Sequence, residues 1–160
     1  MAEQWGLGRE RRRFAGLISQ GRAGPGGPRV AVLLPQTYMN EAGRSAGPAR
    51  GALRLPLERV LVIHDDIDLP FGDVRHRVGG GLAGHNGLKS LARELGGTGF
   101  ARVRIGVGRP EATDPRVVSD YVLSRFSEPV DDVRALVERA GEVAQRTVLA
   151  RPPPERHGGR

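Results

Sequence analysis

The feature that most constrains the fold is an apolar run that ends abruptly in acidic residues. Residues 59–64 read RVLVIH, and the chain continues as DDIDLP over residues 65–70. A short, near-continuous apolar run is typical of an interior strand that is buried on both faces. Residues 73–78 and 102–107 instead alternate apolar and polar side chains, which predicts strands with one covered face. We therefore expect a sheet with the first of these strands in its interior.

Helical patterns lie between and after these strands. Residues 85–96 place Leu88, Leu91, Ala92 and Leu95 on one helical face, and glycines end the pattern. Residues 127–150 carry a longer apolar stripe, with Ser127 as its candidate N-cap. Residues 40–53 have small residues at helical spacing, with Asn40 as the candidate N-cap.

A Gly/Pro-rich turn, GRAGPGGP, separates two short apolar segments, residues 14–20 and 29–34, and so predicts a hairpin. Strands that alternate with helices are typical of an α/β layer fold. At this length we expect one domain over residues 1–150. The last ten residues, RPPPERHGGR, are expected to form a disordered tail.

The charge is basic and unevenly distributed. The formal net charge is +7, and 24 of the 25 basic residues are arginine. Residues 1–60 hold ten arginines against four acids, whereas residues 111–160 hold eight against nine. A positive surface favours a polyanionic partner such as a nucleic acid, although basic residues also serve solubility alone.

The composition argues against membrane-spanning, secreted and cysteine-dependent proteins. No apolar run approaches the roughly 20 residues of a membrane span, and no apolar stretch follows the basic cluster near the start, as a secretory signal would require. The chain has no cysteine, so it has no disulfide, thiolate zinc site or cysteine nucleophile. We expect a cytoplasmic protein that does not associate with a membrane.

Three polar clusters follow the predicted strands, where open α/β sheets usually bind ligands. The first is Tyr38-Met39-Asn40. An asparagine side chain both donates and accepts hydrogen bonds, so Asn40 can hold an amide or ester. Helix capping by Asn40 is the alternative.

The second cluster is His64-Asp65-Asp66-Ile67-Asp68. Three carboxylates so close together repel one another unless a cation, a histidine or backbone N–H groups satisfy them. The sequence leaves open a magnesium site, an aspartate that orients a catalytic histidine, and an Asp-rich turn.

The third cluster is the glycine-rich segment 79–87, GGGLAGHNG, which leads into the predicted helix. Backbone N–H groups at a helix N-terminus favour an anion. Gly79, Gly81 and Gly84 satisfy G-x-G-x-x-G, so an NADP-binding oxidoreductase is one alternative, with Arg102, Arg104 or Arg109 for the 2′-phosphate. His85 and Asn86, however, are polar groups that a dinucleotide loop does not need.

Taken in order, these segments resemble the bacterial-type peptidyl-tRNA hydrolase family. The matching words are LLPQTYMNEAG, VIHDDIDLPFG, GGGLAGHNGLKSL, FARVRIGVGRP and DYVLSRF, which begin at residues 33, 62, 79, 100 and 120. The similarity runs from about Phe14 to Ala150. It implies a three-layer α/β/α fold with a mixed central sheet, a monomer, and hydrolysis of the ester between peptide and tRNA without a metal or other cofactor.

The resemblance also implies roles for single residues. Asp65 matches the residue that holds the catalytic histidine in its basic form. Asn40 and Asn86 match the pair that positions the ester and amide groups of the peptide. Tyr38 matches an aromatic side chain that lines the pocket for the tRNA end. His85, like Asp68, matches a position that flanks the cleft.

One part of the family pattern is missing. Family members open with a strand, a G-L-G-N-P-G-like loop and a T-R-H-N-like segment that supplies the base histidine, and residues 1–13 contain no histidine. The sequence is therefore expected to lack the family's first strand. Either it is an incomplete form of a normal enzyme, or it is a short form that only binds the tRNA end. The first explanation predicts that the nucleotides immediately upstream encode the missing segment in frame.

Overall fold

A computed structural model describes residues 1–150. These residues divide into two compact units, which are described separately. The hairpin unit consists of Met1–Pro56, Gly81–Thr98 and the chain from Gln145. The mixed-sheet unit consists of Leu57–Gly80 and Gly99–Ala144. The single domain expected over residues 1–150 stays a prediction, and the expected tail lies outside the described residues.

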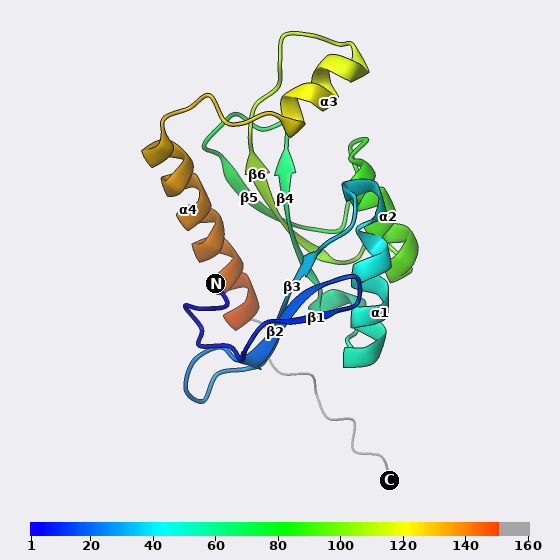
Figure 1. Ribbon diagram of the computed structural model, residues 1–160, viewed down its shortest axis with the longest axis vertical. Helices are drawn as coiled ribbons and strands as arrows, with labels where there is room; N and C mark the ends of the chain where they lie inside the picture. The colour runs from blue at the N-terminus through cyan, green and yellow to red at the C-terminus, as the bar shows by residue number, and fades with distance from the viewer. Residues whose placement is uncertain (151–160) are drawn as a thin grey trace. The chain divides into compact units, whose positions relative to one another are not determined.

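The sheet of the hairpin unit is antiparallel, with strand order β1-β2-β3 (Figure 1). Its strands are β1 (Arg11–Arg13), β2 (Gly16–Arg22) and β3 (Arg29–Pro35). The predicted hairpin around the Gly/Pro turn is therefore confirmed. Strand β1 was not predicted, because three consecutive arginines have neither alternation nor apolar character.

The helices of this unit pack through small residues. They are the 3-10 turn η1 (Met39–Glu41), α1 (Gly43–Leu53) and α2 (Asn86–Leu95). A β-carbon at Gly43 would overlap the carbonyl oxygen of Ser90. At Gly47 a β-carbon would lie 3.0 Å from the carbonyl oxygen of Glu94. Glycine at these positions lets α1 approach α2 closely. The expected N-cap role of Asn40 is wrong, because Asn40 lies within η1 and Ala42 precedes α1.

The sheet of the mixed-sheet unit has the order β4-β6-β5. Its strands are β4 (Leu61–Asp66), β5 (Val74–Val78) and β6 (Ala101–Gly106), and the 3-10 turn η2 (Leu57–Arg59) precedes them. Strand β4 runs parallel to β6 and β5 runs antiparallel to it. The expected α/β class with a mixed sheet is confirmed.

The predicted interior position of β4 is wrong for the described residues. This strand hydrogen-bonds only to β6, and Ile63 is 44% exposed. An apolar run indicates that a strand avoids water, but it does not specify which strands flank it. The strands of residues 1–150 form two three-stranded sheets, where a single central sheet was expected.

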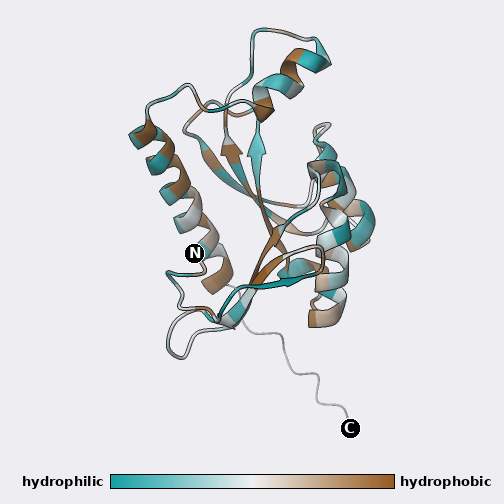
Figure 2. Ribbon diagram, viewed as in Figure 1, coloured by the Kyte–Doolittle hydropathy of each residue, from teal (hydrophilic) through white to brown (hydrophobic). Residues whose placement is uncertain are grey.

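Two helices belong mainly to the mixed-sheet unit. Helix α3 (Pro115–Leu123) was not predicted, and Asp114 caps it through a hydrogen bond from Arg116 N at 2.8 Å. Helix α4 (Val130–Leu149) begins three residues after the predicted start at Ser127. Figure 2 shows hydrophobic and hydrophilic residues alternating along α4, as expected for an amphipathic helix.

Each unit has buried apolar residues. In the hairpin unit they are Trp5, Ile18, Ala49, Leu88, Leu91 and Leu95. In the mixed-sheet unit they are Leu69, Phe100, Ala101, Val103, Leu136, Ala140 and Ala144. Over residues 1–150, no helix has the length and apolar character needed to cross a membrane.

Candidate functional site: two asparagines, an aspartate turn and a basic sheet face

The hairpin unit brings together the two elements that carry the predicted asparagines. Turn η1 contains Asn40 and packs against α2, whose first residue is Asn86. One close approach is at Gly87, where a β-carbon would lie 3.0 Å from Met39 Cγ and 2.9 Å from His85 Cε1. Both asparagines are exposed, so their amides are available to a ligand.

A buried hydrogen bond fixes this arrangement. The N–H of Gly43, the first residue of α1, donates to Ser90 Oγ at 2.9 Å. Ser90 is 2% exposed. The bond links residues 47 positions apart in the chain, so it sets where the turn carrying Asn40 lies along α2.

His85 acts as the N-cap of α2. Its Nδ1 accepts a hydrogen bond from Leu88 N at 3.2 Å. A neutral imidazole accepts at one ring nitrogen and carries its proton on the other, so the cap places the proton on Nε2. In this state His85 has no free lone pair with which to take a proton from water.

Tyr38 lies just before η1 and is 81% exposed. An aromatic ring left in water is a surface on which a nucleotide base can stack. Such exposure is compatible with the pocket-lining position that the resemblance gives to Tyr38.

The acidic cluster spans the end of β4 and the turn after it in the mixed-sheet unit, and its three carboxylates have different surroundings. Asp66 is 8% exposed and accepts from Arg104 Nε at 2.8 Å and from Asp68 N at 2.9 Å. Asp68 is exposed and accepts from Arg109 Nη2 at 2.6 Å. Asp65 alternates with Asp66 along the strand, so it lies on the other face of the sheet.

Burial raises the pKa of Asp66, but opposing interactions outweigh it. The hydrogen bond from Arg104, the backbone N–H of Asp68, and the positive charges of Arg104 and His64 bring the pKa below its ordinary value of 3.8. Asp66 is therefore a structural carboxylate that holds the turn after β4 and anchors Arg104.

A basic sheet face was not predicted from the sequence. The register places Arg75 opposite Arg104 and Arg77 opposite Arg102, so four arginines share one face of β5 and β6. Arg75 also pairs with Asp73 at 2.8 Å. The alternation of the two strands was visible in the sequence, but the register that places like charges opposite one another was not.

Arg102 is the most buried of these four arginines, at 2% exposed. Burial lowers the pKa of its guanidinium, and the charges of Arg77 and Arg104 lower it further, while Asp66 opposes this. Arg102 Nη2 donates to the carbonyl oxygen of Gly79 at 2.5 Å. Like charges opposite one another on a sheet are destabilising, and an anion on this face would relieve that repulsion.

The residues of the alternative functions have other partners. Arg102, Arg104 and Arg109, which an NADP site would use, bind Gly79, Asp66 and Asp68 respectively. Within residues 1–150, no three His, Asp or Glu side chains form a group that could hold a metal ion.

Comparison with known proteins identifies the family. The model of the family described as "Peptidyl-tRNA hydrolase" matches residues 1–152. The chain belongs to the peptidyl-tRNA hydrolase family. The match begins earlier than Phe14, the start of similarity expected from the sequence.

Curated relatives and solved structures agree with this assignment. A peptidyl-tRNA hydrolase of Geobacter sulfurreducens is 48% identical over 80% of this chain and 64% of its own length. One from Geobacter metallireducens is 53% identical over 71% of this chain and 56% of its own length. The crystal structure of a peptidyl-tRNA hydrolase from Acinetobacter baumannii matches with a TM-score of 0.76 and 30% identity, over 93% of this chain and 80% of that chain.

The chain thus spans less than two thirds of the first curated peptidyl-tRNA hydrolases that it matches. Family membership confirms the resemblance on which the sequence analysis relied. The site roles expected from the sequence stay predictions; they concern Tyr38, Asn40, Asp65, His85 and Asn86. The basic sheet face is a further feature of the structure that the sequence did not predict.

Proposed function

We propose that this protein hydrolyses the ester bond between peptide and tRNA in peptidyl-tRNA, and so recycles the tRNA. The observation that carries the proposal is the packing of η1 on the start of α2, which brings the segments of Asn40 and Asn86 together in a family whose members carry this name. In the reaction, water adds to the ester carbonyl carbon and a base takes its proton. The bond to the ribose oxygen then breaks, and that oxygen leaves with a proton.

In this proposal the two asparagines bind the peptide end. The amide N–H groups of Asn40 and Asn86 donate to carbonyl oxygens, and their carbonyl groups accept from peptide N–H. Donors placed where negative charge develops on the ester oxygen stabilise the transition state more than the ground state. Neutral amides suit this role because the substrate ester is itself uncharged.

Asp65 is proposed to orient the histidine that acts as the base. A carboxylate fixes the tautomer of a neighbouring imidazole and stabilises its protonated form. Residues 1–13 contain no histidine, and the cap geometry of His85 occupies its Nδ1. The second candidate is a module that binds the tRNA end without cleaving it.

The basic face and Tyr38 are proposed to bind the nucleic acid part of the substrate. Arginine guanidiniums bind phosphates through two parallel hydrogen bonds, and Arg75 and Arg77 are the exposed arginines of that face. Tyr38 would stack on a base near the tRNA end. No cofactor takes part in the proposed reaction.

The decisive measurement is release of free tRNA from an N-blocked aminoacyl-tRNA by the 160-residue chain. Turnover that falls by orders of magnitude in Asn40→Ala and Asn86→Ala supports the proposal. Gln36→Ala is the matched control, because it removes an exposed amide from the same connection and is expected to keep the parental rate. Near-parental rates in both asparagine variants would refute the roles given to them.

Binding separates the two candidate functions. A chain that binds deacylated tRNA but releases none from the blocked substrate is the binding module, and activity restored by the segment encoded upstream would show that the base lies there. A chain that retains NADP and has no affinity for tRNA would contradict both.

We further propose that the protein acts as a monomer in the cytoplasm, where its tRNA substrate occurs. Sedimentation at several protein concentrations tests the first point, since a mass that rises with concentration contradicts it. Fractionation of the source cells tests the second.

A further inference from the structure

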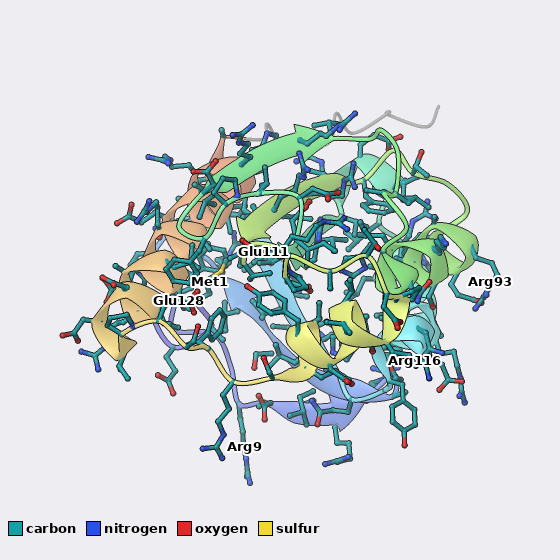
Figure 3. All side chains as sticks on the ribbon, turned by 90° about the horizontal axis from the view of Figure 1, so that it is seen from above. Met1, Arg9, Arg93, Glu111, Arg116 and Glu128 are labelled. Carbon is teal, nitrogen blue, oxygen red and sulfur yellow. The ribbon has the colours of Figure 1, made fainter. Side chains whose placement is uncertain are left out.

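The hairpin unit begins with a cluster of arginines on the outer strand of its sheet. Arg11, Arg12 and Arg13 form β1, which pairs only with β2 among the described strands, and Arg9 lies just before it. All four are exposed, and Figure 3 shows the Arg9 side chain extending away from the ribbon. We call these four residues the arginine edge.

The arginine edge carries a positive net charge. Residues 9–13 hold four arginines and one acid, Glu10, for a net charge of +3. Some exposed arginines elsewhere have carboxylate partners, for example Arg44 with Glu41 at 3.2 Å. Others, such as Arg29 and Arg54, have no ion pair among the described residues, so the edge is distinguished by four exposed arginines within five positions. In the part of the chain that the structure describes, no ion pair is found for any member of the arginine edge.

The backbone holds these arginines in place. Upstream, Trp5 is 7% exposed, and Gly8 N donates to Gln20 O at 3.0 Å. Downstream, β1 turns into β2 through Phe14 and Ala15, both with positive φ (56° and 49°). This geometry is that of the tight turn that matches the twist of a hairpin, and non-glycine residues adopt it at a cost. The cations are thus presented on a fixed strand, which lowers the entropy cost of binding.

The geometry suits the backbone of a polynucleotide. Alternate residues of a strand point to the same side about 6.8 Å apart, so Arg11 and Arg13 lie on one side of β1 and Arg12 on the other. That spacing is similar to the spacing of successive phosphates along an extended strand of RNA. The Arg13 guanidinium also lies 4.5 Å from the centre of the Phe14 ring, which leaves its edge free to donate.

We propose that the arginine edge binds phosphates of the RNA chain, as a second contact away from the ester. The inference rests on the proposed function in one respect, since it takes the RNA to be tRNA. An anionic membrane is a poorer partner, because no apolar side chain is interleaved with Arg9–Arg13 to insert among lipids. Protection of an open sheet edge against aggregation is the competing role for charged edge residues.

The test is the triple substitution Arg11→Gln, Arg12→Gln and Arg13→Gln in the full chain, with deacylated tRNA as the probe. Each lost phosphate contact lowers the slope of log K against log salt by about 0.7–0.9. We expect the slope to fall by about 2 and the affinity at 0.1 M salt to fall at least about tenfold. The matched control replaces Arg93, Arg116 and Arg134 by glutamine. Both triple variants lose three positive charges, so they have the same net charge. The three control arginines are exposed but paired with acids, so their loss should lower the slope by less than about 0.5.

Three outcomes would overturn the inference. The first is an equal change of slope in both triple variants, which would mean that only net charge matters. The second is aggregation of the edge variant with unchanged tRNA affinity, which would assign the arginines to edge protection. The third is salt-dependent binding to vesicles of anionic phospholipid without binding to tRNA.

A parallel assay on the parent chain with N-blocked aminoacyl-tRNA separates this inference from the proposed function. Loss of slope in the edge variant, with no hydrolysis by the parent, supports the arginine edge and contradicts the hydrolase activity. Hydrolysis by the parent, with an unchanged slope in the edge variant, supports the hydrolase activity and contradicts the role of the arginine edge.

Discussion

Ser90 Oγ accepts a hydrogen bond from the backbone N–H of Gly43 at 2.9 Å, and both residues are buried. The bond is the point at which helix α2 holds the start of α1, one step after the turn that carries Asn40. Ser90 is 2% exposed, so loss of its hydroxyl leaves the Gly43 N–H buried without this acceptor.

Ser90→Ala should therefore lower the free energy of unfolding by about 1–3 kcal/mol, the range for a buried donor left without a partner. Urea denaturation measures the change. The control is Ser127→Ala, because Ser127 is exposed and its loss should change stability by less than about 0.5 kcal/mol. Equal stabilities of the two variants would show that the Gly43 N–H finds another acceptor.

Gly87→Ala tests whether the asparagine-bearing elements must approach so closely. A β-carbon at this position would lie 2.9 Å from His85 Cε1 and 3.0 Å from Met39 Cγ, so the side chains of His85 and Met39 must move to accommodate it. We expect turnover of the blocked substrate to fall, by less than the roughly 100-fold that a displacement of about 1 Å at a catalytic centre can cause.

Gly51→Ala is the matched control for Gly87→Ala. Gly51 lies in α1 with nothing within 4 Å of its added β-carbon, so alanine should stabilise the helix by about 0.5–1 kcal/mol. Parental turnover in Gly87→Ala, measured where both variants are folded, would contradict the requirement for close approach.

Local patterns predicted most of the elements but not their partners. The hairpin and the start of α2 at His85 follow from turn and helix signals that act over a few residues. Strand β4 has an equally clear pattern, yet its place at the end of a sheet depends on which strands pair, and no local signal specifies that. Strand β1 has no apolar pattern at all, because an exposed three-residue strand gains its stability from pairing.

The candidate site shows the same division. Asn40, Asp65 and Asn86 could be singled out because they belong to polar clusters near the ends of predicted strands and because their motifs resemble a family. The basic face could not, because Arg77 and Arg102 are 25 positions apart and become neighbours only through the register of β5 on β6. The apolar stripe of α4 was predicted from its periodicity, but two of its residues, Val130 and Val137, are 73% and 60% exposed. Periodicity identifies the apolar face of a helix and does not specify which of its turns are covered.

Acid should destabilise the protein in part through Asp66. Its pKa in the folded protein lies below the ordinary value of 3.8, so the ionised form is favoured by folding. That contribution is fully present above about pH 3.8 and is lost as the pH falls through the lower, folded-state pKa. Asp66→Asn removes the titration and leaves Arg104 without its carboxylate.

We therefore expect Asp66→Asn to be less stable than the parent at pH 6 and the difference to shrink below pH 3.8. Urea denaturation at several pH values from 6 downward measures it. Asp68→Asn is the control, because Asp68 and its partner Arg109 are both exposed and an exposed ion pair contributes at most about 1 kcal/mol. A constant difference between Asp66→Asn and the parent across this pH range would mean that Asp66 does not titrate with folding.

The last prediction concerns the two functions that His85 could have, as a helix cap and as a base. His85→Ala removes the acceptor for Leu88 N and should cost about 1 kcal/mol of stability, the usual value for a lost N-cap. His85→Asn keeps a side-chain acceptor at the N-cap but has no group that can take a proton near neutral pH. If the chain turns over the blocked substrate, His85→Asn should restore both stability and rate to near the parental values, because the cap engages Nδ1 and leaves Nε2 protonated. A His85→Asn variant as stable as the parent but without turnover would instead make His85 the base, with an imidazole that gives up its cap to accept the proton.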